Sequence, residues 1–144
     1  MKFIPLLLVT AVVTAAAAPS PSSIFFEDKD FQVDLVVAMT NHNRSYCSGP
    51  IDAAISDLKT LIGVFETRLR KGVTEGDARL IHGELVGLYG RLAKVYRTAG
   101  SNEFSNEATS IAIENWRLSD KEADASTPYR VQKLVQEMDP CKRP

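Results

Sequence analysis

The sequence has few of the residues that most often carry catalysis. It contains two cysteines, two histidines and one tryptophan in 144 residues. Neither histidine belongs to an H-E-x-x-H zinc motif, and the chain has no G-x-S-x-G nucleophile elbow and no glycine-rich phosphate loop. His42 is expected in a polar loop and His82 on the flank of a helix, both as surface or edge residues. These absences predict no catalytic residue, no metal site and no cofactor, and they favour a non-enzymatic protein.

An excess of positive charge is also lacking. The chain has 17 Lys and Arg against 18 Asp and Glu, so loss of Lys2 with a leader would leave 16 against 18, a net charge of −2. Domains that bind nucleic acid carry basic stripes and a high isoelectric point. The protein is therefore not expected to bind nucleic acid.

Long apolar runs are absent except at the N-terminus. Lys2 precedes an apolar stretch that ends in Ala15-Ala16-Ala17, which is the order of a secretory signal peptide with an A-x-A cleavage site. The stretch from Phe3 to Ala18 is shorter than the roughly 20 residues of a spanning helix, and this disfavours a membrane anchor. We therefore expect residues 1–17 to be a signal peptide and the mature protein to be secreted, extracellular and without a transmembrane segment.

The mature chain is expected to form a short leader and one domain. Removing 17 of the 144 residues leaves 127, the size of a single domain with one core. Residues 18–24 are rich in Pro and Ser and are expected to be disordered. Residues 25–144 are expected to form a helical domain.

The two cysteines are expected to form one disulfide bond. Cys47 and Cys141 are the only thiols, and an even pair in an exported chain is more often bonded than free. The bond would tie the chain before the second helical segment to the C-terminal tail. Closing a loop of about 95 residues in this way would stabilise the fold by about 4 to 5 kcal/mol.

The first segment of the domain has an ambiguous pattern. Between Phe25 and His42, the apolar residues fit either one face of a helix or the alternation of a strand. Helix is favoured, because a lone strand would have no partner. The polar stretch 40–49 is expected to be a loop. It contains Asn43-Arg44-Ser45, an N-glycosylation sequon at Asn43 whose occupancy the sequence leaves open.

Two long apolar stripes follow and predict an antiparallel helical hairpin. The first helix is expected to begin at Ser48-Gly49-Pro50 and to end before Gly72, and the second to begin at Thr74 and to end at Gly100. Apolar residues recur in both at spacings of three and four. The stripes are Ile51, Ile55, Leu58, Ile62, Phe65 and Leu69, and then Ile81, Leu85, Leu88, Leu92, Val95 and Ala99.

Two shorter helices are expected beyond this hairpin. One covers about 102–118, and the other begins at Thr127-Pro128 and stops before Pro140, because the residue before a proline disfavours helix. The predicted fold class is therefore all-α, a small bundle of four to five helices closed by one disulfide.

Three glycines lie in the second long helix, on the face opposite its apolar stripe. Gly83, Gly87 and Gly90 each cost roughly 1 kcal/mol relative to alanine. We call them the glycine strip. Two explanations are open, because either another helix of the same bundle or a separate partner could pack there. The residues predicted for partner binding are the three glycines with the cations of the same sector, Arg79, Lys94 and Arg97.

The expected start of the mature chain resembles that of a known class of secreted proteins. A small helical chain that begins with Ala18-Pro19-Ser20-Pro21 is similar to secreted proteins of filamentous fungi, including host-directed effectors, although no diagnostic motif assigns a family. The expected function is a secreted, effector-like interaction protein that binds a host or environmental macromolecule in virulence. One alternative is a carrier of an apolar small molecule, which needs an internal cavity of several hundred Å³. The other is a helical enzyme that uses positioned charges.

Overall fold

The computed structural model describes residues 28–119 and 122–137, and over these ranges it is all-helical, as predicted. The expected signal peptide, the expected leader and Cys141 lie outside the described residues, so the Cys47–Cys141 bond stays a prediction. The described part has five helices, α1 (Lys29–Ser48), α2 (Ile51–Arg70), α3 (Glu75–Thr98), α4 (Asn102–Leu118) and α5 (Thr127–Glu137).

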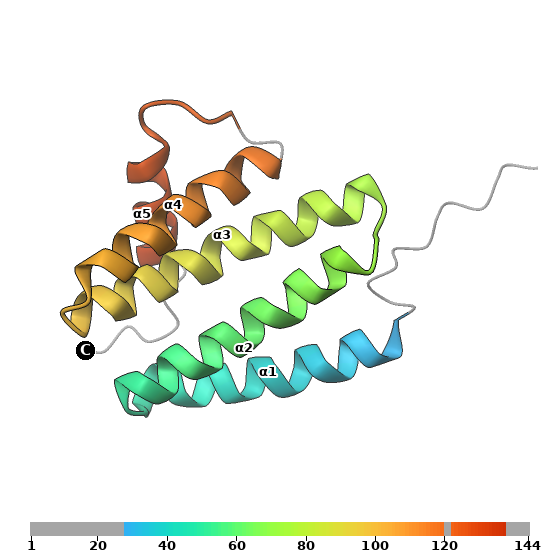
Figure 1. Cartoon of the computed structure of the whole chain (residues 1–144), viewed down its shortest axis with the longest axis horizontal. Helices are drawn as coiled ribbons and strands as arrows, with labels where there is room; N and C mark the ends of the chain where they lie inside the picture. The colour runs from blue at the N-terminus through green and yellow to red at the C-terminus, as the bar shows by residue number, and fades with distance from the viewer. Residues whose placement is uncertain (1–27, 120–121, 138–144) are drawn as a thin grey trace, which may run out of the picture.

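The helices pack in the order in which they follow one another. α1 packs on α2, α2 on α3, and α3 most extensively on α4, while α5 covers parts of α3 and α4. Figure 1 shows α1 and α4 on opposite sides of the α2–α3 pair. In 28–119 and 122–137, no helix is long and apolar enough to cross a membrane.

The predicted α2–α3 hairpin is confirmed, and its turn is built from local signals. Gly72 has a φ of +87°, a left-handed conformation that glycine adopts without strain. The Thr74 hydroxyl then accepts a hydrogen bond from the Asp77 backbone N–H at 3.1 Å and caps α3. The chain therefore reverses within a few residues.

α1 corrects two predictions. Residues 40–48 continue the helix instead of forming a loop, and His42 is 1% exposed instead of lying at the surface. His42 and Ser45 supply the buried face of this stretch, which has no apolar periodicity of its own. As a consequence, Asn43 of the sequon lies on an exposed helical face.

The core has two parts that meet at α3. The larger part lies between α2 and α3, around the fully buried Leu58 and Ile81, and extends to α1, where the Phe31 and Phe65 rings meet edge to face at 6.0 Å. The smaller part lies under α5 and includes Val131. α3 is therefore covered on several sides.

Ser105 attaches α4 to α3, because its fully buried hydroxyl donates a hydrogen bond to the Ala93 carbonyl oxygen at 2.8 Å. We expect Ser105→Ala to lower the free energy of unfolding by about 1 kcal/mol, the usual effect of removing one such bond. Ser110→Ala is the matched control, since its exposed hydroxyl donates to the Asn106 carbonyl oxygen within the same helix. Chemical denaturation measures both variants, and equal losses would contradict this role.

Candidate functional site

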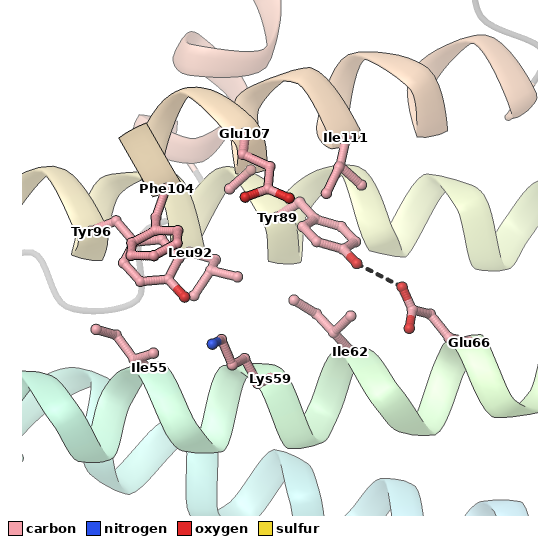
Figure 2. A pocket seen from close by; sticks show the side chains of 11 residues that line it. Ile55, Lys59, Ile62, Glu66, Tyr89, Leu92, Tyr96, Phe104, Glu107 and Ile111 are labelled. Carbon is pink, nitrogen blue, oxygen red and sulfur yellow. Dashed lines mark hydrogen bonds between the residues drawn. The ribbon is translucent and has the colours of Figure 1, made fainter. Parts of the chain in front are cut away.

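An open groove lies between α2 and α4, with α3 as its floor (Figure 2). We call it the α2–α4 groove. Its volume is about 510 Å³, which is within the usual size range of binding sites. Its lining consists of Ile55, Lys59, Ile62 and Glu66 from α2, Tyr89, Leu92 and Tyr96 from α3, and Phe104, Glu107, Ala108 and Ile111 from α4.

Helix geometry explains why these residues line one surface. Each helix contributes residues three or four positions apart, and such residues lie on the same helical face. The sequence predicts Ile55, Ile62 and Leu92 as members of apolar stripes. It gives no signal that Glu66 and Glu107, on two separate helices, border the same groove.

One end of the groove is aromatic. The Tyr96 and Phe104 rings lie 5.3 Å apart at an interplanar angle of 35°, and Figure 2 shows them one over the other. Phe104 is 53% exposed, so its ring forms part of the mouth. The Lys59 Nζ lies 5.7 Å from the centre of the Tyr96 ring, within the range of a cation–π contact.

The other end of the groove is acidic. The Tyr89 hydroxyl donates a hydrogen bond to Glu66 Oε1 at 2.6 Å, and Glu107 extends toward the same ring from α4 (Figure 2). Burial, the bond to Glu66, and the negative charges of Glu66 and Glu107 raise the pKa of the Tyr89 phenol. Tyr89 therefore keeps its proton and acts as a hydrogen-bond donor. The carboxylates of Glu66 and Glu107 make this end of the groove suited to bind a cation.

The structure divides the predicted glycine strip. A Cβ placed on Gly90 would overlap the Val135 Cγ2 methyl of α5 and would lie 3.8 Å from Val131 Cγ1. At Gly83 and Gly87 the same atom would meet nothing within 4 Å. α5 therefore covers the glycine strip at Gly90, while Gly83 and Gly87 face open space.

The cations of the strip differ in their surroundings. Arg79 forms an exposed ion pair with Glu75, at 2.7 Å between Nη2 and Oε1. Lys94 and Arg97 line a small pocket of about 160 Å³ between α3, α4 and α5, beside Gly90. Partner binding by the six predicted residues stays a prediction.

The histidines have structural partners. His82 lies on the flank of α3, as predicted, with its Nδ1 2.8 Å from Asn115 Oδ1 of α4. His42 Nε2 lies 3.2 Å from Arg91 Nη1 of α3, and the His42 ring lies 5.1 Å from that of Tyr46. Burial and the charge of Arg91 lower the pKa of His42 to about 4. Among the described residues, no group of three or more His, Cys, Asp or Glu could hold a metal ion.

No family model, curated protein or solved structure matches the chain. The α2–α4 groove, with its aromatic end and its acidic end, is the candidate functional site.

Proposed function

We propose that this chain is a secreted, non-enzymatic interaction protein that binds a partner protein in the α2–α4 groove. The observation that carries the proposal is the groove itself, where three helices present an open apolar surface with an aromatic and an acidic end. Surfaces of this kind are typical of recognition sites, in which apolar contacts supply affinity and a few polar groups fix orientation.

The occupant that fits best is an amphipathic helix of the partner. α2 and α4 both pack on α3, so a helix placed between them would complete a four-helix arrangement. Such a helix would present apolar residues at spacings of three and four to the groove, as in other helix-in-groove complexes.

The charges of the groove add a second requirement. Glu66 and Glu107 border its acidic end, whereas Lys59, the one cation among the described residues that line it, lies over the Tyr96 ring at the other end. A Lys or Arg beside the apolar face of the partner helix would therefore meet two carboxylates. An acidic partner helix would be repelled.

Secretion of the protein would determine where it meets its partner. If residues 1–17 direct secretion, the protein meets host or environmental macromolecules, which supports an effector-like role. The resemblance to fungal secreted proteins points the same way.

A carrier of an apolar small molecule is the second candidate. The volume of about 510 Å³ would suit one, but Phe104 and Glu107 are exposed at the mouth, so the ligand would stay partly in water. Tyr89 gives no support to the enzyme alternative, because its pKa is shifted away from neutrality, whereas an acid–base residue works best with a pKa near the operating pH.

Selection from a displayed library of random helical peptides on the immobilised mature protein tests the proposal. We expect the enriched peptides to carry apolar residues at i, i+3 or i+4, and i+7, with a Lys or Arg beside them. Phe104→Ala is expected to weaken peptide binding about tenfold, because the variant loses an aromatic contact at the mouth. Glu107→Lys is expected to weaken it as well, and more so at low salt.

Tyr129→Ala is the matched control, since Tyr129 is an exposed aromatic residue of α5 outside the groove. Its peptide affinity is expected to equal that of the parent. Equal affinities of the Phe104→Ala and Tyr129→Ala proteins would exclude the groove as the site. Binding of a fluorescent apolar dye, with no peptide enriched, would favour the carrier.

A further inference from the structure

The outer face of α1 is apolar although the described chain leaves it uncovered. Val33, Val36 and Val37 are 62%, 64% and 56% exposed, while Phe31, Ala38 and His42 form the buried face on the opposite side of the helix. β-Branched residues are not favoured in an exposed helix, and their burial is favourable. Three adjacent valines therefore indicate a surface that becomes covered.

The exposed face of α1 has an apolar centre flanked by polar and charged residues. Its residues lie three or four positions apart on one helical face, with Val33 and Val37 as its apolar centre and Asp30 and Arg44 at its ends. The Thr40 hydroxyl already donates to the Val36 carbonyl oxygen at 2.8 Å, so its polar group needs no further partner. We call this face the α1 stripe. It consists of Asp30, Val33, Val37, Thr40 and Arg44.

The charges of the α1 stripe complement a second copy of the same stripe. Asp30 and Arg44 are both exposed, and each lies seven positions from Val37, on opposite sides of it along the chain. Two α1 helices packed antiparallel around Val37 would therefore set each Asp30 beside Arg44 of the other copy. With about 100° per residue, the two side chains project within about 40° of each other, on the same flank of the stripe. Parallel packing would instead set like charges together.

We propose that two copies of this chain associate through their α1 stripes as an antiparallel, two-fold symmetric dimer. A two-fold contact uses the same surface twice, which a self-complementary charge pattern permits. One helix pair covers less area than the roughly 1,600 Å² of a standard interface, so the dimer is a weak one, with a Kd above about 1 μM. α1 and α4 lie on opposite sides of the α2–α3 pair (Figure 1), so the dimer does not depend on the α2–α4 groove.

Sedimentation velocity of the mature protein tests the dimer. Between about 10 μM and 1 mM, the weight-average mass is expected to rise from that of a monomer toward twice that value, because a contact of this size binds with a Kd above about 1 μM. Val37→Arg is expected to keep the protein monomeric over this range. Leu80→Arg is the matched control, because Leu80 is an equally exposed apolar residue on α3, and it is expected to associate like the parent. Circular dichroism checks that both variants are folded.

A charge exchange tests the orientation of the pair. Asp30→Arg and Arg44→Asp are each expected to weaken association severalfold, because each sets like charges together. An equimolar mixture of the two variants is expected to associate as well as the parent, since every contact again joins an Arg and an Asp. A protein that stays monomeric at 1 mM, a Val37→Arg variant that associates like the parent, or a mixture no better than its components would overturn the proposal.

Discussion

Acidification from pH 7 to pH 4 is expected to lower the free energy of unfolding by about 3 kcal/mol through His42 alone. The folded protein holds the pKa of His42 at about 4, whereas an unfolded histidine has a pKa near 6.5. The unfolded state therefore binds this proton first as the pH falls. The contribution of His42 to the free energy of unfolding is fully present above about pH 6.5. It decreases between pH 6.5 and pH 4 and changes little below that range.

The surroundings of His42 explain the size of this effect. Burial is the largest cause of the low pKa, and the positive charge of Arg91 is the second. Because arginine stays protonated, its Nη1 donates to His42 Nε2, which leaves the imidazole proton on Nδ1. That Nδ1 has no hydrogen-bond partner in the described part of the chain. The negative charge of Asp57 on α2 opposes the shift but does not reverse it.

Urea denaturation at several pH values between 7 and 4 measures this dependence. His42→Gln removes the titrating group, so the stability difference between the parent and this variant is expected to shrink as the pH falls. His82→Gln is the control, because it removes a half-buried histidine of α3 and keeps His42. The same loss of stability on acidification in the parent and in His42→Gln would show that His42 does not carry it.

The α2–α3 hairpin was predictable because its determinants are local. Its apolar residues recur at helical spacing, and both the Thr74 cap and the left-handed Gly72 act within a few residues of their own positions. No partner from a distant part of the chain is needed to define where these helices begin and end.

The sequence predicts only the first half of α1 as a helix, because this helix buries polar residues and exposes apolar ones. Its buried face includes His42 and Ser45, while Val33, Val36 and Val37 face outward. A helix read from apolar spacing therefore loses its signal after residue 39. The polar half of α1 is stabilised by long-range contacts such as that between His42 and Arg91, which no local pattern encodes.

The α2–α4 groove was not predictable for a related reason. Tyr89 and Glu66 are 23 positions apart and meet only when α2 packs on α3. Glu107 borders the same groove only because α4 packs on α3. Periodicity assigns residues to a buried face, but the gap between two helices depends on how all three helices pack.

Alanine substitutions at Gly87 and Gly90 are expected to act in opposite directions, although both glycines lie in the interior of α3. Gly87→Ala is expected to raise the free energy of unfolding by up to about 1 kcal/mol, because its methyl group enters open space and alanine favours helix. Gly90→Ala gains the same propensity, but its methyl group would overlap the Val135 Cγ2 of α5. Displacing a packed valine outweighs that gain, and a net loss of about 1 to 3 kcal/mol is expected.

Chemical denaturation measures both effects, and amide hydrogen exchange locates the second. In Gly90→Ala, faster exchange is expected in α5, around Val131 and Val135, because this helix is displaced from α3. In Gly87→Ala, exchange in α5 is expected to match that of the parent. Stabilisation by both substitutions would show that α5 does not hold Gly90 in solution. The whole glycine strip would then be open to a partner, whereas opposite signs would limit a partner to the surface around Gly83 and Gly87.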